Sequence, residues 1–478
     1  MTTGRALALA LLSAALLSVA ARPFVPGWLA LGALVPLLYA LGAERRLPRA
    51  ALLGAVTALG GGLVAFEGVL PVEPWAYPVL VLLTSVPGAV TAVLFVVVSR
   101  RLGGGAALAV YPLLVGAAEF VVGQRWLFGQ LANTMTVLGA TQFDTPLRLA
   151  AAWSGMTGVG LLVAAVNAAL VAALRWRRFE PLAAIVLLTA LAVLVPAPGS
   201  AVKDRERPEL RVAVVQGAVT SLDTLMARFD PIAAQRMLAT YGALTNATAA
   251  RNPDLIVWGE TVVPRPLRPG EVPEDVATAL SSAPRALVGA VSYVEGRSYN
   301  SIFHWQDGEL HEVYRKRALV PLNERHYTAG QRLPPLDVRG VPIGLGVCLD
   351  SVFGSLAREA VRAGARVLIT LTEDSFAGRT VTPEMHLRLS AFRAVETGRW
   401  LAFANQSGPS AVIDHRGRVI ERLALGQRAA LLVDVPAYEG LTPYVRFGDW
   451  AGLLATVAVA AALVLAAVRS RATATGSP

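Results

Sequence analysis

Two scarce residue types in this chain stand where acyl chemistry could use them. The sequence has one cysteine, Cys348, at the end of an apolar run, and one of its two lysines, Lys316, follows a second run. A carboxylate, Glu260, comes just after a third. A thiolate is a strong nucleophile, a carboxylate can accept the thiol proton, and an ammonium can stabilise the thiolate and the oxyanion formed by its attack. The three side chains are therefore predicted to form a catalytic triad at three strand ends.

The arginine bias of the chain strengthens the interpretation of Lys316. Apart from Lys203 and Lys316, every Lys or Arg position is arginine. Arginine is always charged and forks its donors, whereas lysine is a compact point charge whose pKa can be tuned. Taken singly, Cys348 would be a small core residue, Lys316 a surface charge and Glu260 a neighbour of a helix N-cap. Their joint placement favours the catalytic interpretation.

The residue counts argue against metal and cofactor chemistry. One cysteine excludes a disulfide framework and a cysteine-based zinc site. The five histidines show no ligand spacing such as H-E-x-x-H, and the sequence has neither a G-x-S-x-G serine nor a phosphate-binding loop. No metal and no cofactor is predicted.

The elements that must position the triad lie in a charged segment, residues 201–445. Short apolar runs predict buried strands, and longer amphipathic runs predict helices. The predicted strands are 210–216, 254–258, 286–292, 366–371 and 400–404, the predicted helices are 230–249 and 384–397, and a hairpin turns at Arg416-Gly417. Strands alternating with helices indicate one layered α/β sandwich of about 245 residues.

The rest of the chain is predicted to lie in a membrane. Hydrophobic residues make up 54% of the chain and charged residues only 16%, against about 25% charged in soluble globular proteins. A helix needs about 20 apolar residues to cross the hydrocarbon core. Eight apolar runs are present, at Ala6–Ala21, Trp28–Ala43, Ala50–Leu70, Pro78–Ser99, Ala106–Val122, Leu149–Leu174, Pro181–Val195 and Trp450–Val468. The second and seventh runs are short for a crossing.

These runs define the predicted domain organisation. We expect an α-helical membrane domain over residues 1–195 with about seven transmembrane helices, and the α/β domain inserted after it. A last transmembrane helix over 446–470 would bring the total to about eight, and residues 471–478 would form a cytoplasmic tail.

Arginine placement predicts the orientation of the helices. Alternate breaks between the runs are rich in arginine: Arg45, Arg46 and Arg49, then Arg100 and Arg101, then Arg175, Arg177 and Arg178. Positive loops stay in the cytoplasm, so both termini are predicted inside and residues 196–449 outside the cytoplasm. Much of the net charge of +10 then comes from arginines that fix the orientation of the membrane helices, so it no longer supports nucleic-acid binding.

Two features of the membrane segments leave alternatives open. The run Ala6–Ala21 is expected to be a retained helix, although its small-residue exit also fits a cleaved signal peptide. Glu67 and Glu119 each stand near the outer end of an apolar run. They either line a lipid entrance or simply reach the membrane interface.

The motifs around the triad resemble those of the nitrilase superfamily. The matching phrases are Trp258–Thr261, Tyr299–Ser301, Leu319–Pro321, Gly346–Cys348, Phe392–Arg399 and Ser410–Asp414. Together with the membrane segments, they make nearly the whole chain resemble the apolipoprotein N-acyltransferases of bacterial envelopes. The resemblance implies that the inserted domain is a nitrilase-like α-β-β-α sandwich.

The resemblance also implies a role for each site residue. Glu260 would be the general base, Lys316 would stabilise the tetrahedral intermediate, and Cys348 would take the acyl group. Glu324 matches a supporting carboxylate of the family, and the backbone N–H of Leu349 would complete the oxyanion hole. Asn300 and Asp350 are further supporting or substrate-binding candidates.

The activity so implied is a two-step acyl transfer. The donor would be a membrane phospholipid, and the acceptor the N-terminal amine of a diacylglyceryl-cysteine apolipoprotein. The enzyme would be a monomer in the bacterial plasma (inner) membrane, with its catalytic domain on the extracytoplasmic side. Two alternatives stay open: a membrane-tethered amidase or hydrolase that uses the same triad, and a non-catalytic membrane relative.

Three segments depart from the family pattern. Leu349-Asp350 stands where the acyltransferases have Tyr-Glu, and Leu322-Asn323 precedes Glu324 where Phe-Gly is usual. The segment Glu373–Phe376 replaces an expected Asn-Asp-(small)-Trp. These loops are expected to surround the acyl pocket, so they bear on substrate preference and rate.

Overall fold

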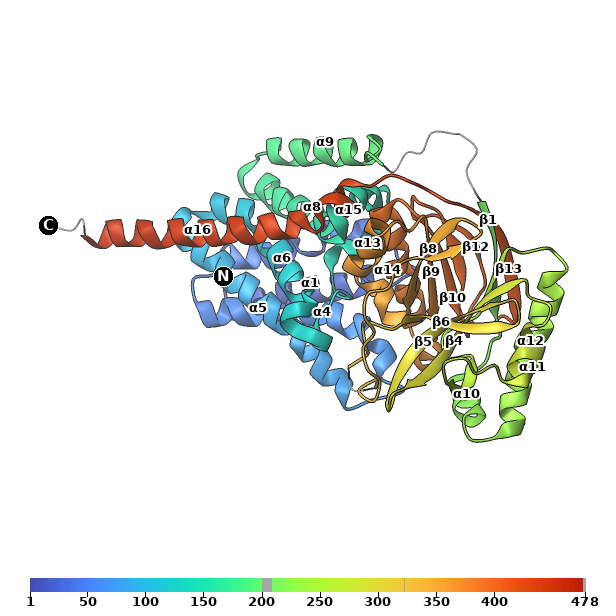
Figure 1. Ribbon diagram of the computed structural model, residues 1–478. Helices are drawn as coiled ribbons and strands as arrows, with labels where there is room; N and C mark the ends of the chain where they lie inside the picture. Colours follow the sequence, from blue (N-terminus) through green and yellow to red (C-terminus); the bar gives the residue numbers. More distant parts are fainter. Residues whose placement is uncertain (200–208, 322, 476–478) are drawn as a thin grey trace. The chain divides into compact units, whose positions relative to one another are not determined.

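The computed structural model describes residues 1–199, 209–321 and 323–475. The predicted start of the α/β domain at Ala201 and the last residues of the predicted tail lie outside the described residues. The chain forms two compact units, one of Met1–Ala197 and Phe447–Pro478 and the other of Pro198–Arg446. Figure 1 shows the helices of the first unit in blue to green with α16 in red, and the sheets of the second unit in green to red.

The first unit is helical and strongly apolar. Among the described residues, six helical segments are long and apolar enough to cross a membrane: Thr3–Ala20 (α1), Leu47–Ala65 (α4), Ala76–Leu102 (α5), Gly104–Val122 (α6), Pro146–Trp176 (η5 and α8) and Trp450–Arg469 within α16. Two shorter apolar stretches, Gly27–Leu41 (η1, α2 and α3) and Glu180–Leu194 (α9), coincide with the second and seventh predicted runs. The helical membrane unit is confirmed, with six long helices; eight crossings remain a prediction.

The last helix differs from its predicted bounds. Helix α16 spans Trp450–Thr475, so it continues past residue 470 into the predicted tail. The added segment contains no glycine or proline, and alanine is the strongest helix former, so nothing in its sequence ends the helix there.

Glycines let the helices of this unit approach closely. A Cβ at Gly54 of α4 would lie 2.2 Å from the carbonyl oxygen of Gly88 on α5, and one at Gly60 would lie 2.1 Å from the carbonyl oxygen of Ala14 on α1. The Ser18 hydroxyl of α1 donates to the Gly60 carbonyl over 2.6 Å. In lipid, such close packing and hydrogen bonding replace the hydrophobic effect between helices. Helix α1 is therefore packed against α4 as a member of the unit.

Both membrane acids singled out in the sequence have partners. The Glu119 carboxylate accepts a hydrogen bond from the backbone N–H of Leu138 over 2.7 Å. Glu67 pairs with Arg22 at 3.6 Å between Oε2 and Nη2. A role for either acid at a lipid entrance stays a prediction.

The second unit is built on two β-sheets. The first runs in the order β13-β1-β2-β4-β5-β6, with β3 paired to β4, and the second in the order β12-β11-β10-β9-β8-β7. The strands of the first sheet are Glu209–Gln216 (β1), Leu255–Val257 (β2), Val263–Leu267 (β3), Arg285–Val294 (β4), Arg297–Gln306 (β5), Glu309–Arg315 (β6) and Ala429–Pro436 (β13). Those of the second are Leu336–Val338 (β7), Val341–Val347 (β8), Val367–Thr372 (β9), Trp400–Asn405 (β10), Ala411–Ile413 (β11) and Val419–Arg422 (β12).

Side chains alternate between the two faces of each strand, and in the first sheet each face packs into a separate hydrophobic core. One set of side chains, including Val214 and Val257 of the first sheet and Ile369 and Ala402 of the second, forms a single buried cluster between the sheets. The opposite face of the first sheet packs on Ser221–Ala227 (α10), Pro231–Ala249 (α11) and Glu274–Leu280 (α12). Helices Gly354–Arg362 (α13) and Thr382–Thr397 (α14) contact the second sheet. The layers are helix, sheet, sheet and helix, as Figure 1 shows, which confirms the predicted α-β-β-α sandwich.

The predicted strands and helices of this unit are present with small shifts at their ends. The predicted strand 286–292 is longer, as β4, because it pairs with the whole length of β5. The hairpin at Arg416-Gly417 joins the antiparallel strands β11 and β12.

Candidate active site

Glu260 follows the short central strand β2, and its backbone is held from both sheets. Its N–H donates to the Thr372 carbonyl over 3.3 Å, and the Gly259 carbonyl accepts from the N–H of Gly289 on β4 over 3.2 Å. A Cβ at Gly289 would lie 2.4 Å from the Gly259 oxygen and 2.7 Å from the Cα of Glu260. Glycine at position 289 therefore allows the close approach that places Glu260. The next residue, Thr261, has φ +49°, which is rare for a β-branched residue.

Lys316 lies directly after β6 and is 1% exposed. Its backbone N–H donates to the Asn300 carbonyl of β5 over 2.7 Å. Its ammonium donates to Glu260 Oε1 over 3.1 Å and to Glu324 Oε1 over 2.8 Å. One buried cation thus joins two buried carboxylates from different parts of the chain.

Asn300 joins the same two carboxylates. Its side-chain N–H₂ group donates to Glu260 Oε1 over 2.7 Å and to Glu324 Oε1 over 3.0 Å. The second oxygen of Glu324 accepts from the backbone N–H of Val320 over 2.7 Å. The predicted residues Glu260, Asn300, Lys316 and Glu324 therefore form one connected group, the carboxylate–ammonium cluster.

Charge and burial set the protonation of this cluster. Burial raises the pKa of Glu260; the Lys316 ammonium opposes this rise and the charge of Glu324 reinforces it. Burial alone would lower the pKa of Lys316, but the charges of Cys348, Glu260 and Glu324 raise it well above its ordinary value. Lys316 therefore stays an ammonium, and Glu260 is a stronger base than an ordinary glutamate.

Cys348 directly follows β8 and begins the short helix η6, Cys348–Val352. Its φ is +46°, in the left-handed region that costs an L-residue roughly 1–3 kcal/mol unless its surroundings hold it. The side chain is 8% exposed. Burial and the charge of Glu260 raise the thiol pKa well above its ordinary value, and Lys316 acts in the opposite direction. The resting residue is therefore a thiol that needs a base at the moment of attack.

The two residues after Cys348 occupy different positions. Leu349 is partly buried, and its N–H is among the first of η6, where helix N–H groups have no intrahelical acceptor. Asp350 is buried and accepts hydrogen bonds from the backbone N–H groups of Val347, Arg317 and Ala318 over 3.1, 3.1 and 2.6 Å. Asp350 thus ties the turn that carries Cys348 to the segment that carries Lys316.

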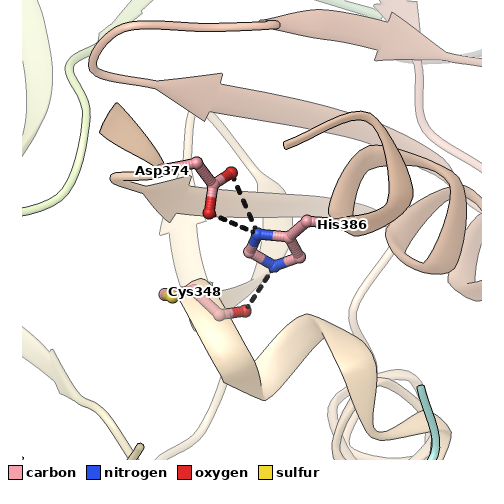
Figure 2. Close-up of side chains that lie close together, drawn as sticks. All are labelled: Cys348, Asp374 and His386. Carbon is pink, nitrogen blue, oxygen red and sulfur yellow. Dashed lines mark hydrogen bonds and ion pairs between the residues drawn. The ribbon is translucent and has the colours of Figure 1, made fainter. Parts of the chain in front are cut away.

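The structure adds two residues that the sequence reasoning did not single out as site residues. Asp374 lies just after β9, and His386 lies on α14; Figure 2 shows both beside Cys348. The ring Nδ1 of His386 lies 3.0 Å from both carboxylate oxygens of Asp374, and Nε2 lies 3.1 Å from the Cys348 carbonyl oxygen. The available signal was that β9 is parallel to β8, because the carboxyl ends of parallel strands share one sheet edge.

Cys348, Asp374 and His386 also present three kinds of metal-ligating atom within 4.8 Å of one another. The histidine spacing examined in the sequence did not suggest this group. Both imidazole nitrogens are engaged by protein oxygens, so the geometry is that of an internal ion pair beside Cys348.

Sequence relatives identify the family. The model of the apolipoprotein N-acyltransferase N-terminal domain matches residues 13–169, and that of carbon-nitrogen hydrolase matches residues 211–444. An apolipoprotein N-acyltransferase of Geobacter metallireducens is 30% identical over 497 residues, covering 92% of this chain and 90% of the relative. One of Gloeobacter violaceus is 31% identical, covering 91% and 89%. This chain belongs to the apolipoprotein N-acyltransferase family.

The second unit of this family member also matches solved structures of the nitrilase superfamily. A mutant amidase from Nesterenkonia covers 51% of this chain and 95% of its own at 21% identity, with a TM-score of 0.39. The Nit3 protein of Saccharomyces cerevisiae covers 49% and 93% at 19% identity, with a TM-score of 0.40. The family assignment rests on the sequence relatives. An apolipoprotein N-acyltransferase with this helical unit is a bacterial membrane protein, an acyltransferase with a carbon-nitrogen hydrolase domain.

Proposed function

We propose that Cys348 carries the acyl group in a two-step transfer from a phospholipid to the amine of a diacylglyceryl-cysteine apolipoprotein. The observation that carries this proposal is the carboxylate–ammonium cluster, whose charges act on the only cysteine in the chain. The cluster supplies a base and a fixed positive charge, which are the two groups that a thiol needs for attack on an ester.

In the first step the thiol proton leaves as the sulfur attacks. The raised pKa of the Glu260 carboxyl favours transfer of this proton to Glu260, and the raised pKa of the Cys348 thiol keeps the proton on the sulfur until attack on the ester carbonyl begins. Lys316 and the N–H of Leu349 stabilise the oxyanion. Glu260 then protonates the leaving alkoxide, so a lysophospholipid departs and a thioester remains.

In the second step the thioester passes to an amine. The uncharged α-amino group attacks the thioester carbonyl, and Glu260 accepts the proton that the nitrogen loses. The thiolate leaves, takes that proton back, and the amide product is released. Transfer rather than hydrolysis requires that bulk water be kept from the thioester, and the burial of Cys348, Glu260 and Lys316 supports this requirement.

An exposed apolar patch supports a lipid substrate. It lies on α10, on the start of α11 and on the loop between them, and its members are Leu222, Leu225, Met226, Phe229 and Ile232. Phe229 is 81% exposed, an unusual state for a phenylalanine in an α/β domain. Apolar clusters of this kind mark contact sites for lipid or partners. We therefore assign this patch to contact with acyl chains or the membrane surface.

The cellular setting is part of the proposal. The arginine pattern supports an inner-membrane protein with its catalytic unit on the extracytoplasmic side, where the acceptor lipoproteins would be met. A monomer suffices for the chemistry, because Glu260, Asn300, Lys316, Glu324 and Cys348 all lie in one unit of one chain.

Intact-protein mass spectrometry tests the first step. Purified protein incubated with phospholipid vesicles should gain one fatty-acyl mass, and Cys348→Ser should not. Glu260→Gln should also fail to gain it while its thiol still reacts with a small alkylating reagent. A wild-type protein that never gains the mass would contradict the proposal.

The second step separates transfer from hydrolysis. A diacylglyceryl-cysteine peptide with a free amine should remove the acyl mass and become amidated, whereas an N-acetylated peptide should not. Release of free fatty acid alone, with no amide product, would favour the hydrolase alternative. Unchanged function of the protein after Cys348→Ala would favour the non-catalytic alternative.

A further inference from the structure

The turn that carries Cys348 is held from one side by a buried chain of polar groups. Asn405, at the end of β10, donates to an oxygen of Asp374 over 2.6 Å. Asp374 contacts Nδ1 of His386 at 3.0 Å, and Nε2 of His386 faces the Cys348 carbonyl oxygen at 3.1 Å. Figure 2 shows the imidazole standing between the carboxylate and that carbonyl group.

The Asp374 carboxylate and the Cys348 carbonyl determine which nitrogens of the His386 ring carry a proton. A carboxylate and a peptide carbonyl both accept hydrogen bonds, and neither donates one. A neutral imidazole would satisfy one of them and set its lone pair against the other. The doubly protonated ring satisfies both, and the Asp374 carboxylate balances its charge.

This contact acts on a strained residue. Cys348 has φ +46° without being glycine, so its peptide group must be fixed by its surroundings. Ser351 donates to the same carbonyl over 2.8 Å and also contacts Nε2 of His386 at 3.0 Å. The contact on the carbonyl of Cys348 therefore bears directly on where its sulfur points.

We propose that Asp374 and His386 are positioning residues: Asp374 keeps the His386 ring doubly protonated, and its Nε2–H holds the Cys348 carbonyl so that the nucleophile keeps its left-handed turn. This inference rests on the proposed role of Cys348 as nucleophile. It concerns the orientation of the thiol, whereas Glu260 and Lys316 act on its proton and charge.

Several titratable groups surround the ring and enter any test by pH. Asp374 and Glu373 follow β9, Glu260 follows β2, and Cys348 opens η6. Burial would lower the pKa of His386, but the charge and hydrogen bond of Asp374 and the Cys348 carbonyl raise it. Burial raises the pKa of Glu373 to about 7. Since these neighbouring acids titrate in every variant, the informative quantity is the ratio of two rates at the same pH.

The central experiment compares wild type with Asp374→Asn between pH 5.5 and 8.5. In the variant the ring loses the charge that keeps it protonated, so its pKa falls, and at neutral and higher pH the Cys348 carbonyl faces a neutral N–H donor in place of a charged one. Acylation by phospholipid should be about fivefold slower there, the difference between a hydrogen bond from a charged donor and one from a neutral donor. The ratio should shrink toward one at low pH, where the ring is protonated again.

Two variants of the histidine complete the test. His386→Gln keeps a neutral N–H donor, so it should stay within about threefold of wild type, with a ratio that does not change with pH. His386→Ala lacks the donor and should be slow at every pH. His304→Gln is the control for loss of a buried histidine, since His304 on β5 is 5% exposed and His386 is 6% exposed. It should acylate like wild type throughout.

Alkylation of Cys348 by iodoacetamide provides a second readout that needs no lipid. The chain has one cysteine, so each alkylated molecule gains the mass of one carbamidomethyl group. Alkylation should follow the same order and the same pH dependence as acylation. A wild type that alkylates in this pattern but never acylates would refute the proposed function and leave the positioning role standing.

Three outcomes would overturn the inference. The first is a ratio of wild-type to Asp374→Asn acylation rates that is the same at every pH. The others are a wild-type acylation rate in His386→Ala, or an equal loss of rate in His386→Gln and His386→Ala. If Asp374→Asn does not fold, as shown by its melting temperature, the acylation rates of His386→Gln and His386→Ala decide.

Discussion

At the scale of single residues, the site holds one cation between two acids. Lys316 is shared by Glu260 and Glu324, so the cluster keeps a net negative charge when all three are ionised. Burial raises the pKa of Glu260, the Lys316 ammonium lowers it, and the charge of Glu324 raises it in turn. Glu324, which the family resemblance gave as a supporting carboxylate, therefore acts electrostatically on Glu260.

Replacement of this second acid should change the pH dependence of the reaction. In Glu324→Gln the negative charge that raises the pKa of Glu260 is gone, so that pKa falls. Since Glu260 acts as a base when ionised, the acid limb of the acylation rate should move to lower pH. The maximal rate should fall by about tenfold because Lys316 loses a charged partner. Initial rates between pH 4.5 and 8.5 measure both effects; a limb that moves to higher pH would contradict the assignment.

The amide of Asn300 should contribute through both acids at once. Asn300→Ala removes donors to Glu260 and Glu324, and hydrogen bonds to charged groups contribute about 1.5–3 kcal/mol. Acylation should slow by about tenfold to a hundredfold, since 1.36 kcal/mol is tenfold. Asn246→Ala, at an exposed asparagine of α11, is the control. A wild-type rate in Asn300→Ala would remove Asn300 from the site.

Sequence reasoning succeeded for residues whose rarity or spacing marked them. Cys348 and Lys316 are scarce types, and the structure brings Lys316 together with the predicted Glu260, Asn300 and Glu324. Neither rarity nor spacing marked His386, which lies in the largely buried helix α14, and its partner Asp374 follows β9. Their contact depends on how α14 packs on the second sheet, and no local pattern encodes that distance.

At the scale of elements, strand ends do most of the positioning. β8, β9 and β10 are parallel neighbours, so Cys348, Asp374 and Asn405 come from the same edge of the second sheet. β2 and β6 bring Glu260 and Lys316 from the first. Left-handed residues follow β2 and β8, at Thr261 and Cys348. Turns of this kind therefore stand beside Glu260 and at Cys348, the proposed base and nucleophile.

The close backbone approach at Gly289 should be intolerant of a methyl group. Gly289→Ala would put a Cβ 2.4 Å from the Gly259 oxygen and force the strand end with Glu260 to move. Overpacking costs about 1–3 kcal/mol in stability, and a shifted base should lower acylation by more than about tenfold. Gly346→Ala is the control, since its nearest contacts are an ordinary 3.6 Å. Melting temperatures and acylation rates compare the two; tolerance of both changes would contradict the role of Gly289.

The elements themselves were predictable because strands and helices alternate in a charged segment with clear apolar runs. The pairing of two sheets face to face was not encoded locally, and it entered through the family resemblance. The short helical stretch Gly27–Leu41 shows the same limit in the membrane unit. Its composition matches a span, but whether it crosses depends on neighbours.

At the scale of the whole molecule, the arginine pattern predicts a membrane topology that labelling can test. In a Cys348→Ser background, single cysteines at the exposed positions Glu271 and Arg46 sample the α/β unit and an arginine-rich break. An impermeant maleimide should label position 271 in intact spheroplasts, and position 46 only after the membrane is opened. The reverse pattern would place the catalytic unit in the cytoplasm.

The apolar patch should matter for donors that remain in a membrane. Leu222→Ser with Phe229→Ser removes two of its most exposed members. Acylation from vesicles should fall by about tenfold or more, the loss expected when two apolar contacts of about 1 kcal/mol each disappear. Acylation from a dispersed short-chain donor and alkylation of Cys348 should stay unchanged. Equal loss with both donors would show that the patch serves the fold instead.

The solitary thiol has a consequence for oxidant stress. A sulfenic acid formed on Cys348 has no second cysteine in the chain to condense with, so no internal disulfide can halt its further oxidation to the irreversible sulfinic state. Shielding is the remaining protection, and at 8% exposure the residue has it at rest. Peroxide should therefore inactivate this enzyme most readily whenever the shielding is relaxed to admit a lipid.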